Sequence, residues 1–183
     1  MRVGIAHHFG WAIAVTATDD HRVVDKRRIA LVEPGMPGGP IHHESKPLDD
    51  AGAAQMVAEV RASSLRIAAT ELDALAADVG KPMTSMSLRA WPADFPADIA
   101  TLRRVPYEAR ADSVMYRQVL AGLAAQRGWA LHTFDAKDVE AEAAKVLGAS
   151  ADAVLNGPRQ RLGPPWTKDH RIALAATVLA VHA

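Results

Sequence analysis

The fold is decided by the stretch RVGIAHHFGWAIAVTATDDHRVVDKRRIALVE, residues 2–33. Val, Ile and His at residues 3, 5 and 7 alternate with Gly, Ala and His at residues 4, 6 and 8. Trp, Ile and Val at residues 11, 13 and 15 alternate with Ala, Ala and Thr at residues 12, 14 and 16, and such alternation is typical of strands with two different faces. The sequence Asp19-Asp20-His21 is a turn signal, and it precedes a third run rich in Val, Ile and Leu at residues 22–33. Three such runs joined by short turns predict an antiparallel meander of three strands.

After this meander the pattern changes to alternating helices and strands. A loop rich in proline and glycine covers residues 34–47, and apolar residues three or four positions apart then predict a long helix. The predicted elements are a helix at 49–79, a strand at 83–90, a helix at 112–126, a strand at 129–134, and helices at 135–147 and 167–181. Residues 97–110 are ambiguous, and residues 156–166 are predicted to be irregular. We place Leu131, Ile172 and Leu179 in the core.

This order of elements predicts an α/β fold with a five-stranded mixed sheet in the order 3-2-1-4-5. Strands 1 to 3 are antiparallel, and helices cover both faces of the sheet because parallel crossovers need covering helices. The chain has 183 residues, which we expect to form a single domain, 1–183. Its net charge is zero, so it is not a generally basic nucleic-acid coat protein.

The composition also bears on compartment and chemistry. There is no cysteine, which excludes disulfide scaffolds, cysteine nucleophiles and cysteine-ligated metals. The longest apolar run, residues 172–181, is far shorter than the roughly 18 residues that a membrane span needs. The N-terminal apolar stretch is too short for a signal peptide. We therefore expect a soluble cytoplasmic protein with no membrane partner.

Two segments suggest a family. Residues 3–15 read VGIAHHFGWAIAV, and residues 168–176 read KDHRIALAA. Together with the order of elements, these segments resemble the ribonuclease H-like fold, and most closely its resolvase and pre-rRNA-processing branch. In that branch the first strand reads Gly-Ile-Asp, a short turn leads to Gly-x-x-x-Ala-Val, and the last helix opens with an acidic residue before an alanine-rich run.

The resemblance implies a nuclease in which acidic side chains of the first strand, the fourth strand and the last helix hold two divalent ions. This chain has Ala6 at the first of these positions and Ser87-Leu88-Arg89 at the second, so only Asp169 is retained. A single carboxylate does not assemble a two-metal site. The resemblance therefore predicts a ribonuclease H-like domain that has lost this chemistry and binds nucleic acid, a nucleotide or a protein partner.

An alternative is a metal-dependent nuclease or phosphodiesterase with a rebuilt site. In this fold the end of the first strand, with His7 and His8, meets the start of the last helix, with Asp169 and His170. His7, His8 and Asp169 are the candidate ligands of a divalent transition metal such as zinc, nickel or manganese, and Asp169 and His170 are the candidate catalytic residues. Because adjacent side chains of a strand point to opposite faces, we expect at most one of His7 and His8 to face the cleft. The competing interpretation is one packed and one surface histidine.

Basic residues are expected to complete the ligand site. The loop at 157–166 is basic and glycine-containing and leads into a helix N-terminus, which favours anions, so we expect it to form one wall. The candidate ligand-binding residues are Arg89, Arg159, Arg161, Trp166 and Lys168. Asp112 and Ser113, with Tyr116 and Arg117, are a further candidate lining. His42-His43-Glu44 is a second cluster, in the long loop. A third interpretation is a homodimer that uses the helix at 49–79.

Overall fold

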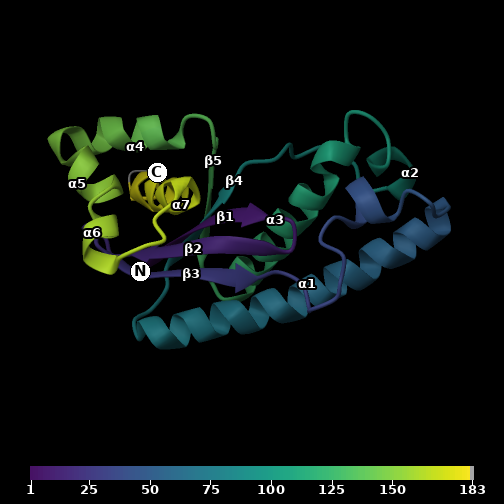
Figure 1. Cartoon of the computed structure of the whole chain (residues 1–183), viewed down its shortest axis with the longest axis horizontal. Coiled ribbons are helices and arrows are strands. Elements are labelled where there is room, and N and C mark those ends of the chain that lie inside the picture. The colour runs from purple at the N-terminus through teal and green to yellow at the C-terminus, as the bar shows by residue number, and fades with distance from the viewer. Residues whose placement is uncertain (182–183) are drawn as a thin grey trace.

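The computed structural model describes residues 1–181 and is built on a five-stranded sheet in the order β3-β2-β1-β4-β5 (Figure 1). Strands β1, β2 and β3 are antiparallel neighbours, whereas β4 is parallel to β1 and β5 is parallel to β4. Their bounds are β1 (Arg2–His8), β2 (Trp11–Ala17), β3 (Val23–Ala30), β4 (Ser85–Arg89) and β5 (Ala130–Phe134). The predicted α/β fold, with its mixed sheet and strand order, is confirmed.

A two-residue turn, Phe9-Gly10, joins β1 to β2 and fixes their register. Gly10 has a φ of 77°, in the left-handed region that glycine adopts without strain. The turn places His8 directly opposite Trp11, with Ala6 opposite Ile13. These four side chains therefore lie on one face of the sheet, and His7 points to the other face.

Helices cover both faces of the sheet (Figure 1). On one face lie α1 (Asp50–Val79) and α3 (Glu108–Gln126), and on the other lies α7 (Lys168–Leu179), with α4 (Val139–Leu147) packed against it. Asp49 caps the start of α1 by accepting a hydrogen bond from the N–H of Gly52, and Gly80 ends the helix with a φ of 63°. The short elements are η1 (Pro40–Glu44), α2 (Ile99–Leu102), η2 (Gly148–Ser150), α5 (Ala151–Leu155) and α6 (Pro158–Leu162).

The strand alternation divides the core into two layers. Val3 and Ile5 pack with Leu72 and Leu120 beneath α1 and α3. Ile13 and Val15 of the neighbouring strand pack with Leu174 and other residues of α7. The sheet is thus apolar on both faces, as expected when helices cover both sides.

Helix α7 lies unusually close to the central strand β1. A Cβ atom added to Gly4 would lie 1.9 Å from the carbonyl oxygen of Ala173. The Nε of Arg2, at the start of β1, donates to the carbonyl of Thr177, near the end of α7. The helix therefore runs antiparallel to β1, and its first turn lies over the carboxyl end of that strand.

Several details of the prediction need correction. Leu131 is 41% exposed because β5 is an edge strand, and Ile172 and Leu179 are only partly buried. The buried face of α7 instead carries Ala173, Leu174, Ala176, Thr177 and Val178. The helix predicted at 112–126 begins at Glu108. The segments predicted to be irregular contain η1 and α6, each five residues long.

Candidate functional site

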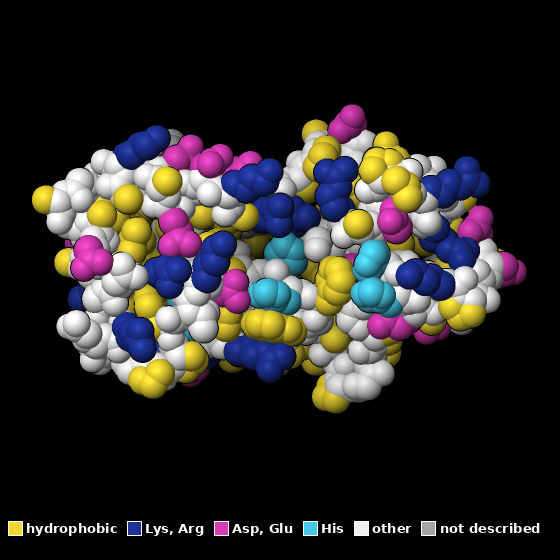
Figure 2. Space-filling view, turned by 45° about the horizontal axis from the view of Figure 1, so that its top comes forward, with side chains coloured by type: hydrophobic (Ala, Val, Ile, Leu, Met, Phe, Trp, Pro, Cys, Tyr) yellow, Lys and Arg dark blue, Asp and Glu magenta, His cyan; other side chains and the backbone are white. Residues whose placement is uncertain are grey.

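A pocket of about 260 Å³ lies at the end of the sheet where the carboxyl ends of the parallel strands β1 and β4 meet the start of α7. We call it the sheet-edge pocket. In Figure 2, histidine side chains gather beside a hollow in the middle of one face, with Lys and Arg side chains on either side of it. The residues that line the pocket are Ile5, Ala6, His7, His8, Arg89, Ser113, Phe134, Ala136, Asp169 and Ile172.

Both histidines at the end of β1 line this pocket, so the prediction that at most one of them faces the cleft was wrong. Their side chains do leave the strand on opposite faces, as the pleat requires. The pocket caps the end of the sheet, however, and draws its walls from both faces. His7 belongs to the wall beside Ser113 of α3, and His8 belongs to the wall beside Asp169 of α7.

His8 and Asp169 form a hydrogen-bonded pair across 161 positions of sequence. The Nε2 atom of His8 lies 3.0 Å from Oδ2 of Asp169. The His8 ring stacks on Trp11, with ring centroids 4.1 Å apart and an angle of 12° between the planes. The Arg28 guanidinium lies over the Trp11 ring at 4.5 Å. Stacking and hydrogen bonding together hold the imidazole at the mouth of the pocket.

The predicted site did not include Trp11 and Arg28 as supports of His8. A usable signal was present in the two-residue turn, because such a turn pairs its flanking residues directly across the hairpin. His8 and Trp11 flank Phe9-Gly10 and are paired in this way.

Arg89 lines the pocket, and Arg117 of α3 lies behind it and contacts the backbone of the lining residues. Arg117 is only 4% exposed, and its guanidinium donates to the carbonyls of Ser113, Arg89 and Ala90. Within residues 1–181 no carboxylate lies within 4.0 Å of it. Burial, together with the charges of Arg89 and Arg110, lowers its pKa to about 10, so Arg117 stays protonated at neutral pH. Of the four α3 residues predicted to line this cleft, Ser113 lines it, Arg117 lies behind the lining, and Asp112 and Tyr116 do not line it.

His7 is held neutral by its surroundings. Burial lowers its pKa from 6.5 to about 3, and the charges of Arg117, His8 and Arg89 act in the same direction. A hydrogen bond with the backbone of Ser113 opposes these effects. The folded protein therefore disfavours protonated His7, whereas the unfolded chain takes up this proton readily.

This difference predicts a pH-dependent stability. The pKa of His7 is lower in the folded protein than in the unfolded chain. Its contribution to stability is therefore complete above pH 6.5 and is lost progressively as the pH falls from 6.5 toward 3. We expect the urea midpoint of the wild type to fall between pH 7.5 and pH 5.5, and to fall less in His7→Gln. Urea titrations at the two pH values measure it. His132→Gln serves as the control, and an equal fall in the wild type and His7→Gln contradicts the prediction.

His170 does not belong to the sheet-edge pocket, so its predicted catalytic role is not supported by the geometry. Its side chain is 3% exposed, and its Nδ1 accepts a hydrogen bond from the N–H of Thr167 at 3.2 Å. The ring packs against Trp166, with centroids 5.3 Å apart. Burial lowers the pKa of His170. The residue thus helps to cap the N-terminus of α7, and it lines the neighbouring pocket of about 460 Å³ rather than the sheet-edge pocket.

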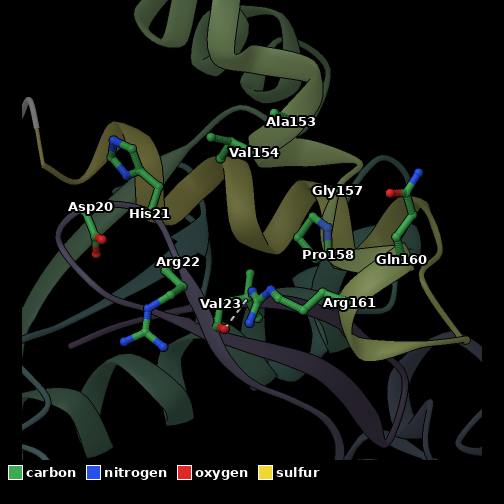
Figure 3. A pocket seen from close by; sticks show the side chains of 10 residues that line it. All are labelled: Asp20, His21, Arg22, Val23, Ala153, Val154, Gly157, Pro158, Gln160 and Arg161. Carbon is green, nitrogen blue, oxygen red and sulfur yellow. Dashed lines mark hydrogen bonds between the residues drawn. The ribbon is translucent and has the colours of Figure 1, made fainter.

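The basic loop at 157–166 does not form a wall of the sheet-edge pocket. Arg161 donates to the carbonyl of Val23, beside a different pocket of about 480 Å³ between α6 and the start of β3 (Figure 3). Trp166 is 8% exposed and donates to the carbonyl of Leu155, so it is a core residue and offers no stacking surface. Arg159 and Lys168 are exposed and lie outside the lining of the sheet-edge pocket. Of the candidate ligand-binding residues, Arg89 alone lines it.

The long loop with His42-His43-Glu44 is anchored to α3. Asp112 is 1% exposed and accepts hydrogen bonds from the N–H groups of Ile41 and His42, each at 2.9 Å. Tyr116 donates its hydroxyl to the carbonyl of Gly38. Burial raises the pKa of the Asp112 carboxyl. Asp112 and Tyr116 are therefore anchors of this loop, which carries His42 and His43 beside Phe9.

The donor set of the pocket does not fit the predicted metal site. Within residues 1–181 no three His, Asp or Glu side chains are arranged so that they could hold a metal ion. His8 and Asp169 are hydrogen-bonded to each other, and His7 lies on the opposite wall beside Arg117. A cationic neighbour favours an anionic ligand over a metal cation.

Comparison with known proteins adds no family to this description. Neither the protein-family models nor the curated proteins gave a match to this chain. In the described part of the chain, no helix combines the length and hydropathy of a membrane span.

Proposed function

We propose that this protein is a ribonuclease H-like domain that binds the phosphate group of a nucleotide or nucleic acid in the sheet-edge pocket. The observation that carries this proposal is Arg89 in the lining of the pocket, with a second positive charge close behind it. The buried Arg117 has no carboxylate partner within residues 1–181, and it contacts the backbone of the lining residues Ser113 and Arg89. A buried charge normally has an oppositely charged partner. An anion in the pocket would contact Arg89 and bring a negative charge close to Arg117.

The free hydrogen-bonding capacity on this wall suits an anion. The Arg89 guanidinium lines the pocket, and within residues 1–181 its side chain has neither an ion pair nor a hydrogen bond. Arginine is the side chain best suited to phosphate, because its planar group donates in two parallel directions.

The size of the pocket favours a phosphate group with a small substituent inside it. About 260 Å³ lies just below the roughly 300–1,000 Å³ typical of sites that enclose a whole small molecule. A neighbouring pocket of about 460 Å³ shares Asp169 and is lined by Trp11, Lys26 and Arg28. The remainder of a nucleotide, or the next unit of a nucleic acid, would lie over this second surface.

Arginine substitutions test the proposal. We expect Arg89→Met to weaken binding of inorganic phosphate and of adenosine 5′-monophosphate about tenfold or more, and Arg117→Met to weaken it less, because Arg117 lies behind the lining of the pocket. A hydrogen bond to a charged group contributes roughly 1.5–3 kcal/mol, and about 1.4 kcal/mol corresponds to a factor of ten. Calorimetric titration at low salt measures both ligands, and a short single-stranded oligonucleotide in a third titration distinguishes nucleotide from nucleic acid.

Arg159→Met is the matched control, because Arg159 is exposed and lies on the basic loop outside the pocket. Its affinity for phosphate should equal that of the wild type. Arg89 is exposed, so Arg89→Met should fold even if the loss of the buried Arg117 harms folding. Loss of binding in Arg159→Met with wild-type binding in Arg89→Met would move the site to the loop and contradict the proposal.

A further inference from the structure

We propose that the His8–Asp169 pair makes the sheet-edge pocket a site of phosphate-ester hydrolysis that needs no metal ion, with His8 as the general base. This inference rests on the proposed phosphate binding and extends it from binding to chemistry. It is carried by the geometry of the pair and by its place in the same pocket as Arg89.

The hydrogen bond to Asp169 selects the tautomer of the His8 imidazole that can act as a general base. A carboxylate accepts hydrogen bonds, so Nε2 of a neutral His8 carries the proton and Nδ1 carries the lone pair. Nδ1 has no hydrogen-bond partner among the described residues. A histidine oriented by a carboxylate on one nitrogen and free on the other is the arrangement of a general base.

The surroundings keep this base in place while leaving it accessible. The His8 side chain is 43% exposed and that of Asp169 is 31% exposed, so water reaches the pair. Stacking on Trp11 restricts the ring to one orientation. The position of Asp169 in the first turn of α7, a helix of 12 residues, fixes the carboxylate relative to β1.

The proposed step uses only groups of the pocket and water. Nδ1 of His8 takes a proton from a water molecule as the water oxygen forms a bond to phosphorus. The bond from phosphorus to the ester oxygen breaks, and that oxygen leaves with the bonding electron pair. Arg89, with the charge of Arg117 behind it, stabilises the charge on the phosphoryl oxygens, and His8 returns its proton to solvent. A leaving group such as p-nitrophenolate needs no protonation.

Two chromogenic esters test this step in the presence of EDTA. The wild type should release p-nitrophenolate from p-nitrophenyl phosphate, bis(p-nitrophenyl) phosphate or both, and the two arms distinguish a monoesterase from a diesterase. His8→Gln should lower kcat about 100-fold or more, because removing a general base costs roughly 10²–10⁴-fold. His8→Gln should still bind phosphate, since Arg89 and Arg117 are intact. His43→Gln, an exposed histidine outside the pocket, is the control.

Asp169 acts through His8 and is a positioning residue, so its test needs a readout beyond activity. Asp169→Asn should lower kcat, and Asp169→Glu should restore part of it. Nitrogen NMR of His8 should show the Nε2-protonated tautomer in the wild type and a shift away from it in Asp169→Asn. Asp94→Asn, at an exposed position, should leave both readouts unchanged.

The outcomes separate this inference from the proposed function. If EDTA abolishes turnover, or if His8→Gln retains it, His8 is not a metal-independent base and the inference is overturned. If the wild type binds phosphate but hydrolyses neither ester, the inference fails and the proposed binding stands. If the wild type does not bind phosphate, the proposed function itself fails.

Discussion

Replacing Gly4 with alanine is expected to destabilise the protein by about 3 kcal/mol or more, the upper part of the range for overpacking a close-packed interior. The added Cβ would lie 1.9 Å from the carbonyl oxygen of Ala173, and both are backbone-linked atoms that no rotamer change can separate. Relief requires that α7 move away from β1. That movement would open the apolar layer between the sheet and α7.

Urea denaturation followed by circular dichroism measures the effect. Gly122→Ala is the matched control, because Gly122 is exposed within α3 and a Cβ there meets no atom within 4 Å. Alanine in a helix interior is favoured over glycine by roughly 0.5–1 kcal/mol, so this control should be slightly stabilised. A Gly4→Ala protein with the wild-type midpoint would show that α7 is not packed on β1 as described.

Truncating Leu174 to alanine is expected to cost about 2–5 kcal/mol, whereas the same change at Leu131 should stay within about 0.5 kcal/mol. Leu174 is fully buried in α7, and its truncation leaves a cavity against the sheet. Leu131 is 41% exposed on the edge strand β5, so its removal leaves no cavity. Thermal and urea unfolding of the two variants compare identical chemistry at two degrees of burial.

Equal effects of the two leucine variants would contradict the description of α7 as a core helix and β5 as an edge. Neither variant touches the sheet-edge pocket, because neither residue lines it. Phosphate binding in Leu131→Ala should therefore match the wild type, which separates stability from the proposed function.

Much of the candidate site could be predicted from the sequence, because strand order alone places it. Once β1 is central and β4 is its parallel neighbour, their carboxyl ends open at one edge, where ligands of α/β sheets commonly bind. His7, His8, Arg89 and Asp169 were predicted to lie there, and all four line the pocket. His170 was also predicted to line this cleft but lies outside it, because its ring turns toward Trp166, a contact that its position in the first turn of α7 does not reveal.

The basic loop shows a second reason why such predictions fail. The basic composition of this loop favours binding of an anion, and the loop was therefore predicted to form one wall of the ligand site. Three-dimensional packing instead buries Trp166 and ties Arg161 to β3. A charged side chain near a helix N-terminus can reach several partners, and in the folded chain a hydrogen bond to the carbonyl of Val23 holds Arg161 beside β3. Arg117 shows the opposite case, since its burial without a carboxylate cannot be recognised from the residues around it in the chain.

The sequence by itself determined the local elements and, through them, the topology. The alternation along residues 2–33, the three-to-four residue spacing along α1 and the glycine and proline breaks between elements depend on neighbours in the chain. Only the tertiary structure decided which side of the pocket each histidine lines and which nitrogen of His8 contacts Asp169. It also decided that the buried Arg117 has no carboxylate partner within residues 1–181. The physical reason is that burial, hydrogen-bond partners and electrostatic fields depend on groups distant in sequence, such as His8 and Asp169, which are 161 positions apart.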